Sequence, residues 1–271
     1  MSQEEREPEE GERVPFLAHL EELRNRLIKA FLAVIVGFFA CYGFSDRLFS
    51  FVSQPIRDAL DKAGGHMQIL HPMEGFVTDL KVAFVGGLVI ALPVILYQLW
   101  RFVAPGLYAH EKRYVWPFVA GATVFFLAGA AFAYYMVFPV AFPILFGYAG
   151  KGVLPMPSKE SALELPLKLL LSFGLIFELP VVTFFLAKMG LVHYKLLSKN
   201  RGYSVIGILV VAAFLTPTGD PFNQLLMALP LYLLFELSIV IARVFGPTPP
   251  QEEKEAEDVD EEPPAPPSVT E

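Results

Sequence analysis

Three carboxylates stand out in this sequence because of the residues around them. Glu22 lies in HLEELRNRL, four residues before Arg26, and Glu111 lies in FVAPGLYAHEKR beside two basic residues. Glu178 lies in LLLSFGLIFELPVVTFFLA, with no charged residue within nine positions on either side. Carboxylates bind guanidinium groups through charge-assisted hydrogen bonds, and they can also carry protons. The candidate chemistry is therefore cation recognition or proton transfer.

Each carboxylate also has a purely structural interpretation. The spacing of Glu22 and Arg26 predicts an intrahelical ion pair, which stabilises a helix by about 0.3 to 0.5 kcal/mol. Glu111 beside Lys112 is typical of a solvated loop. For Glu178 the apolar surroundings favour a functional role, because a charge at the centre of a bilayer is costly unless it is neutralised, paired or hydrated. Pro180 follows it and is expected to bend the helix there.

Other chemistry is weakly supported. The turn LTPTGDPFNQ holds Asp220 and Gln224, but a turn of this composition needs no functional explanation. The five histidines show no metal-ligand spacing, and the sequence has no GxxxxGK[ST] phosphate loop. A single cysteine, Cys41, excludes an internal disulfide. We expect no cofactor, no metal and no nucleic-acid partner.

The elements that position these groups are predicted to be transmembrane helices. Hydrophobic residues make up 54% of the chain and charged residues 18%, whereas soluble domains average about 25% charge. An apolar helix of about 20 residues crosses roughly 30 Å of hydrocarbon. The predicted fold class is therefore an all-α polytopic membrane protein. Its six transmembrane helices are expected at residues 27–45, 82–100, 114–138, 163–187, 202–215 and 222–244.

Several of these segments have irregular features. Segment 202–215 has 14 residues, and segment 222–244 has 14 residues before Glu236, so we expect helices five and six to be short. Pro139 and Pro143 are expected to end or kink the third helix. Ahead of the first span, VPFLAHLEELRNRLIKAF has apolar residues at helical spacing. This pattern predicts an amphipathic helix at the membrane interface.

The distribution of charge predicts the orientation. Segments 101–113 and 188–201 hold seven basic residues in 27, whereas the intervening segments hold seven in 60. Because cytoplasmic loops are enriched in Lys and Arg, both termini are predicted in the cytoplasm, with the protein in the cytoplasmic (inner) membrane. The formal charge of −7 comes from acidic ends. We expect a disordered segment 1–15, a transmembrane domain 16–245 and a Pro-rich, acidic, disordered tail 246–271.

Four motifs occur in order across residues 16–244: HLEELRNRL, YQLWRFVAPGLYAHEKR, FELPVV and LTPTGDPFNQLLMALPLYLLFE. In this order and topology they resemble the TatC family, the signal-peptide-binding core of the twin-arginine translocase. The resemblance implies a concave, glove-like bundle and a non-enzymatic receptor for the twin-arginine signal peptides of folded precursors. It also implies export driven by the proton-motive force, single-span TatA-type and TatB-type partners, and self-association in the complex.

The resemblance also implies which residues bind the signal peptide. Glu22 and Glu111 match the carboxylates that hold the paired arginines in that family. Arg101 and Phe102 are implied as neighbours of the site. His19 and Arg24 of the N-terminal motif are also expected to contact the signal peptide.

A second set of matching positions is polar and lies within or beyond the membrane. Glu178 matches an acid of the fourth helix that faces the concave interior in the family. Asp220 and Gln224 match polar residues at the outer turn before the last helix. The Thr-Gly pair before Asp220 departs from the more usual Pro-Pro-Asp form of the family.

The main alternative is a proton-coupled small-solute transporter built around Glu178. Such transporters often contain inverted repeats, and segments 27–138 and 163–244 show no convincing internal similarity. An intramembrane enzyme is a third hypothesis. It is disfavoured because no nucleophile and base occur at a recognisable spacing.

Overall fold

The computed structural model describes residues 14–103, 115–150, 152–216 and 221–246. The chain divides into two compact units, Met1–Glu178 and Leu179–Glu271. The described residues are helical apart from turns, loops and one isolated β-bridge between Gln68 and Ser158. Residues 1–13 and 247–271 of the two expected disordered ends, as well as Glu111 and Asp220, fall outside the described residues. Val14 and Pro15, expected in the disordered N-terminal segment, instead begin the first helix.

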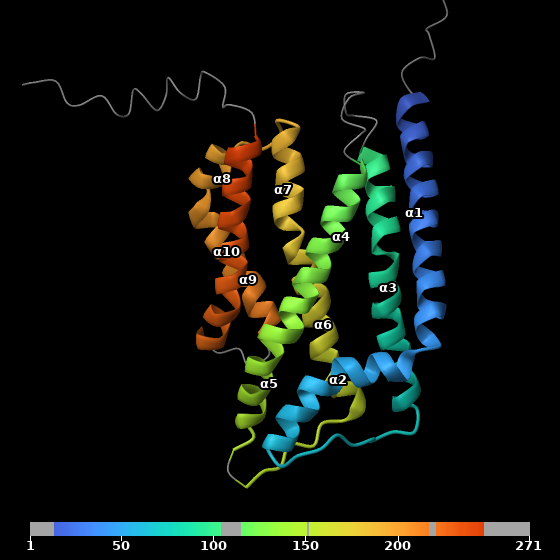
Figure 1. Cartoon of the computed structure of the whole chain (residues 1–271), viewed down its shortest axis with the longest axis vertical. Helices are drawn as coiled ribbons and strands as arrows, with labels where there is room; N and C mark the ends of the chain where they lie inside the picture. The colour runs from blue at the N-terminus through green and yellow to red at the C-terminus, as the bar shows by residue number, and fades with distance from the viewer. Residues whose placement is uncertain (1–13, 104–114, 151, 217–220, 247–271) are drawn as a thin grey trace, which may run out of the picture. The chain divides into compact units, whose positions relative to one another are not determined.

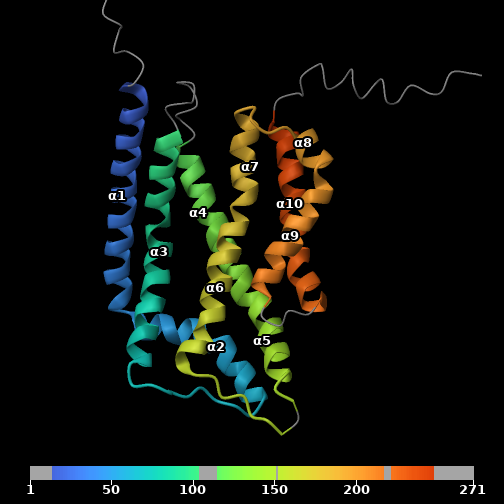
Figure 2. The same cartoon turned by 180° about the vertical axis from the view of Figure 1, so that it is seen from behind.

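In the first unit, α1 (Val14–Tyr42), α3 (Glu74–Val103), α4 (Val115–Phe132) and α6 (Lys159–Phe177) run alongside one another, and α2 (Ser45–Lys62) crosses one end (Figures 1 and 2). The crossing helix, α2, lies at the end where α1 finishes and α3 begins. Phe138, Phe142 and Phe173 are among the fully buried side chains of this unit. Its remaining elements are the π-helix η4 (Ala133–Val137) and α5 (Phe138–Gly147).

The second unit is a smaller group of helices in which α10 packs against both α7 and α9. The short helix α8 lies immediately before α9 in the chain and contacts α10. The elements of this unit are α7 (Leu179–Lys188), α8 (Tyr194–Lys199), α9 (Arg201–Leu215) and α10 (Pro221–Phe245).

The predicted spans correspond to helices of the structure. Five helical stretches within the described ranges are long and apolar enough to cross a membrane, and α9 is a shorter apolar helix. These six stretches match the six predicted segments in order, so the all-α polytopic class is confirmed. The five long ones are His19–Tyr42, Glu74–Phe102, Val115–Gly147, Lys159–Lys188 and Asn223–Phe245.

The expectation that helix six is short is wrong. Helix α10 has 25 residues, which gives a length of about 37 Å at 1.5 Å per residue. Glu236 does not interrupt it, because its carboxylate accepts a 2.8 Å hydrogen bond from the Tyr232 hydroxyl and pairs with Arg201 at 2.9 Å. The fifth predicted helix is short as expected, since α9 has 15 residues.

Two other segments are more continuous than predicted. The amphipathic stretch and the first span form one helix, α1, because residues 16–36 contain no Gly or Pro to separate them. The third helix does not end at Pro139 or Pro143 but continues to Gly147. A π-helical stretch directly precedes these prolines. Such a stretch changes the hydrogen-bond pattern where a proline lacks its donor.

Glycines allow α1 and α3 to approach closely. A Cβ atom added to Gly87 would lie 2.4 Å from the backbone nitrogen of Phe38, and one added to Gly37 would lie 2.5 Å from the carbonyl oxygen of Gly87. No side chain fits at these distances, because the blocking atoms belong to the backbone. The two glycines therefore determine how close the helices come.

We expect Gly87→Ala to destabilise the first unit by about 1 to 3 kcal/mol, since the added methyl group must push the helices apart. The buried thiol of Cys41 provides the measurement, because its labelling rate during heating reports when this unit opens. Gly121→Ala is the matched control, since a Cβ there meets no atom within 4 Å. Equal labelling midpoints for the two variants would show that this close contact is not needed for stability.

Candidate functional site

A group of polar and aromatic side chains joins the N-terminal part of α1 to the last turns of α3. The rings of His19 and Phe102 are stacked, with centroids 4.4 Å apart and an interplanar angle of 21°. Further along α1, the Arg26 Nη1 atom donates a 3.3 Å hydrogen bond to Gln98 Oε1. These contacts connect residues that are 72 or more positions apart in the sequence.

Glu22 lies between these two contacts along α1. Its Oε1 atom accepts hydrogen bonds from Arg26 Nη2 at 2.6 Å and from Arg26 Nε at 3.1 Å. The predicted intrahelical ion pair is therefore confirmed. The side chains are 32% exposed for Glu22 and 15% exposed for Arg26, so the carboxylate is accessible to a ligand while its partner is mostly covered.

The other predicted neighbours differ in position. Arg101 is close enough to act electrostatically on Glu22, and its guanidinium lies 5.8 Å from the centroid of the Tyr97 ring. Arg24 is directed to solvent, where it lies 4.0 Å from Glu21 with both side chains 69% exposed. The structure thus brings Arg101 to the group around Glu22 but leaves Arg24 outside it.

The name Glu22 cluster denotes His19, Glu22, Arg26, Gln98, Arg101 and Phe102. Sequence reasoning included four of these residues in the site and treated Arg26 only as an ion-pair partner. It missed Gln98. The available signal was an amide side chain inside the apolar segment 82–100.

Glu111 belongs to the connection between α3 and α4, which lies outside the described residues. Helix α3 ends at Val103, directly after Phe102, and α4 begins at Val115. The chain segment that carries Glu111 therefore starts and finishes next to helix ends, and one of these ends belongs to the Glu22 cluster.

Glu178 terminates α6 and is buried, with 7% of its surface exposed. Its Oε1 atom has no hydrogen-bond partner in the part of the chain that the structure describes. The helix is interrupted at this residue, two positions before Pro180, as the proline predicts. A buried and incompletely bonded carboxylate is costly inside a membrane, and a functional role for Glu178 stays a prediction.

Gln224 connects the two last helices. Its Nε2 atom donates a 2.9 Å hydrogen bond to the carbonyl oxygen of Leu209, so the first turn of α10 is bound to the middle of α9. The structure gives this predicted site residue a packing role. Asp220, its expected neighbour, is not among the described residues.

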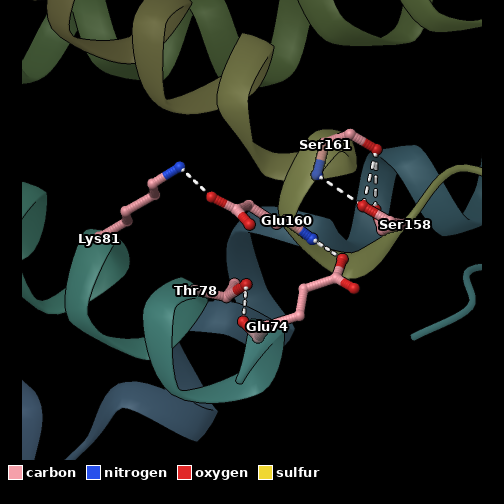
Figure 3. Close-up of polar contacts among 6 residues, drawn as sticks. All are labelled: Glu74, Thr78, Lys81, Ser158, Glu160 and Ser161. Atoms are coloured by element: carbon pink, nitrogen blue, oxygen red, sulfur yellow. Dashed lines mark hydrogen bonds and ion pairs between the residues drawn. The ribbon is translucent and has the colours of Figure 1, made fainter. Parts of the chain in front are cut away.

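A second polar cluster at the opposite end of the first unit was not predicted (Figure 3). Glu74, the first residue of α3, is 4% exposed. Its Oε2 atom accepts from the backbone nitrogen of Leu70 at 2.8 Å, and its Oε1 atom accepts from the backbone nitrogen of Glu160 at 2.7 Å. One carboxylate thus joins the start of α3 to the first turn of α6.

The surroundings of Glu74 point to a structural role. Ser158 caps α6 by accepting a hydrogen bond from the backbone nitrogen of Ser161, and Lys81 forms an ion pair with Glu160. The backbone N–H groups of Leu70, His71 and Glu160 donate hydrogen bonds to the Glu74 carboxylate, and the Ser158 side chain also lies within its reach. No group of three or more metal-ligand side chains occurs among the described residues. The cluster fastens two helix starts and offers no open ligand position.

Comparisons with known proteins agree on one family. The family described as Sec-independent protein translocase protein (TatC) matches residues 18–230. The chain is 43% identical over 247 residues to the Sec-independent protein translocase protein TatC of Desulforapulum autotrophicum, covering 91% of each chain. It is 41% identical over 250 residues to the protein of the same description from Koribacter versatilis, again covering 91% of each.

Solved structures give the same result. A crystal structure described as the twin arginine translocase receptor TatC superposes with a TM-score of 0.73 at 36% sequence identity, covering 83% of this chain and 97% of that one. A second crystal structure of that receptor, in the detergent DDM, superposes with a TM-score of 0.75, covering 83% and 99% of the two chains.

Proposed function

Since this chain belongs to the TatC family, we propose that it is the receptor and core subunit of a twin-arginine translocase, which exports folded proteins across the membrane independently of Sec. It is a multi-pass membrane protein and acts as a transporter component rather than as an enzyme. The small-solute transporter built around Glu178 has no support from these relatives.

The Glu22 cluster is the proposed site for an arginine of the signal peptide. The observation that supports this role is that the partly exposed Glu22 carboxylate already accepts two hydrogen bonds from a guanidinium, that of Arg26. An arginine of a signal peptide can make the same kind of bond. The His19 ring, three residues before Glu22 on α1, stacks on Phe102 of α3.

Glu111 is proposed to bind the second arginine. Its segment leaves α3 one residue after Phe102, so it starts beside the Glu22 cluster. Two carboxylates, each holding one guanidinium, would explain a requirement for paired arginines. A lysine pair would bind less well, because an ammonium group cannot reproduce the planar fork of a guanidinium.

This function places the Glu22 cluster on the cytoplasmic side. The proposed orientation, with both termini in the cytoplasm, rests on the density of Lys and Arg in segments 101–113 and 188–201. In the first unit, the start of α1 and the end of α3 lie at the same end, opposite α2 (Figure 1). The cluster around Glu74 would then face the extracytoplasmic side.

The second unit offers a surface for a single-span partner of the TatA or TatB type. Helices α9 and α10 form an open, almost entirely apolar groove of about 500 Å³. Helix α9 is about 22 Å long, which is shorter than the hydrocarbon core of roughly 30 Å. A longer partner helix packed in the groove would cross the whole core. The groove is lined by Val205, Ile208, Leu209, Leu225, Leu226, Ala228, Leu229 and Tyr232. The proposed export is driven by the proton-motive force, and copies of this chain are proposed to associate with one another in the complex.

Photo-crosslinking in native membranes tests the receptor function. A photo-reactive amino acid at position 102, in the Glu22 cluster, should crosslink to a twin-arginine precursor and not to the same precursor with a Lys-Lys pair. A probe at position 47, an exposed arginine at the start of α2, serves as the control and should give no precursor adduct. Equal crosslinking of the two precursors at position 102 would contradict the proposed site.

A further inference from the structure

Arg26 occupies the carboxylate that the incoming signal peptide needs. Two nitrogens of its guanidinium donate to Glu22 Oε1, at 2.6 and 3.1 Å. A guanidinium of the signal peptide would seek the same acceptor. Glu22 therefore has a partner before any ligand arrives, and that partner has the same chemistry as the ligand.

A second acceptor stands beside this ion pair. Gln98 on α3 accepts a hydrogen bond from Arg26 Nη1 at 3.3 Å. If Arg26 gave up Glu22, this bond could remain, and the guanidinium would keep an acceptor on the neighbouring helix. The cost of releasing Glu22 is thereby reduced, because a partly buried guanidinium is not left without an acceptor.

We propose that Arg26 is an internal competitor that occupies Glu22 in the unliganded receptor and is displaced onto Gln98 by a signal-peptide arginine. This inference rests on the proposed function of Glu22 and adds to it a residue that sets the affinity of the site. Displacing Arg26 from Glu22 costs free energy, and the contact of the ligand with Glu22 must exceed that cost. A guanidinium matches the bond that it replaces, whereas an ammonium forms a weaker contact and displaces Arg26 less well.

The other cations near Glu22 are less suited to this role. His19 is engaged through its ring with Phe102, and Arg101 contacts Tyr97. Arg24 lies on the solvent side next to Glu21. Among the described residues, only Arg26 forms hydrogen bonds with the Glu22 carboxylate and also with an acceptor on α3.

Two features of the geometry permit exchange. The Glu22 side chain is 32% exposed, so a ligand can reach it, and Arg26 is 15% exposed, so it has little access to water as an alternative partner. Displacing an exposed pair would hardly change the affinity for a ligand, because the net contribution of such a pair is close to zero. Displacing a partly covered pair costs more free energy, so this pair lowers the affinity for every ligand that needs Glu22.

The experiment measures binding of fluorescent twin-arginine and Lys-Lys signal peptides to the full-length, detergent-solubilised receptor. We expect Arg26→Gln to bind the twin-arginine peptide about threefold to tenfold more tightly. The affinity for the Lys-Lys peptide should rise by a similar factor, because displacing Arg26 costs the same free energy for both peptides. Arg26→Lys should raise the affinity for the twin-arginine peptide by an intermediate factor while keeping the positive charge. It therefore separates the loss of the guanidinium fork from the loss of charge repulsion between residue 26 and the peptide arginine.

Lys29→Gln is the matched control, since Lys29 is exposed on the same helix and its removal lowers the positive charge equally. It should change affinity less than Arg26→Gln. Gln98→Leu should weaken binding of the twin-arginine peptide, because the displaced Arg26 would lose its second acceptor. That loss should disappear in the double variant with Arg26→Gln.

The possible failures can be distinguished. If Glu22→Gln binds the twin-arginine peptide as well as the unaltered protein does, the proposed receptor site is wrong. If Glu22→Gln loses binding while Arg26→Gln leaves affinity unchanged or weakens it, the site stands and the competitor role is overturned. A gain in Lys29→Gln as large as in Arg26→Gln would reduce the effect to general charge and would also overturn the proposal.

Discussion

Replacing Glu22 by lysine is expected to reduce export of a twin-arginine precursor by at least about 30-fold. The variant removes a charge-assisted acceptor from the proposed binding site. It also places a positive charge where a guanidinium must bind. The measurement is accumulation of a folded twin-arginine reporter outside the cytoplasmic membrane in cells that produce only the variant receptor.

Glu21→Lys is the matched control for this prediction. Glu21 is the adjacent residue of α1, is 69% exposed and lies 4.0 Å from Arg24, so its reversal makes the same charge change outside the Glu22 cluster. Export should stay within about twofold of the unaltered level, since exposed ion pairs contribute about 0 to 1 kcal/mol. Membrane levels of both variants must be compared, because the lysine introduced by Glu22→Lys would also repel Arg26.

A direct comparison decides the outcome for Glu22. Equal export by Glu21→Lys and Glu22→Lys would show that the total charge of the α1 start matters rather than the carboxylate. Glu22→Gln provides an isosteric test that adds no repulsion. It should lower export by about tenfold. The double variant Glu22→Gln with Glu111→Gln should lower export further, because each carboxylate is proposed to hold one arginine.

Glu74→Gln is expected to destabilise the first unit by about 1 to 3 kcal/mol. Both carboxylate oxygens accept backbone hydrogen bonds, one from Glu160 and the other from Leu70 and His71. An amide has only one acceptor oxygen, so its NH₂ group must face a backbone N–H at one of these positions. The cost is high because Glu74 is buried.

The labelling rate of Cys41 on heating again provides the measurement for Glu74→Gln. Glu164→Gln, an exposed acid further along α6, is the control and should leave the midpoint unchanged. A midpoint for Glu74→Gln equal to that of the control would show that the fastening of α3 to α6 contributes no stability. Signal-peptide affinity should be little affected, since Glu74 and the Glu22 cluster lie at opposite ends of α3.

Local spacing predicted contacts within single helices well. The Glu22–Arg26 pair lies four residues apart and follows directly from the 3.6-residue period of a helix. The short α9 follows equally directly from the length of its apolar segment. The length of α10 could not be read in this way, because Glu236 is tolerated only through its partners Arg201 and Tyr232.

Contacts between helices were not predictable in the same way. Sequence spacing gave no reason to join Arg26 to Gln98, or Glu74 to the first turn of α6. These pairs depend on which helices are neighbours and on their relative shift along the axis. For α1 and α3, that fit includes the close approach at Gly37 and Gly87, which nothing in the linear sequence marks as a contact.

Apolar length, charge density and motif order are properties of a linear chain, so they were enough to establish the membrane class, the six apolar segments, the family resemblance and the carboxylates worth testing. They could not reveal that Glu22 is already held by a guanidinium with a second acceptor on α3. That arrangement comes from the folded molecule. Partners 72 residues apart meet only when two helices pack in one register, and side-chain packing at the helix interface sets that register.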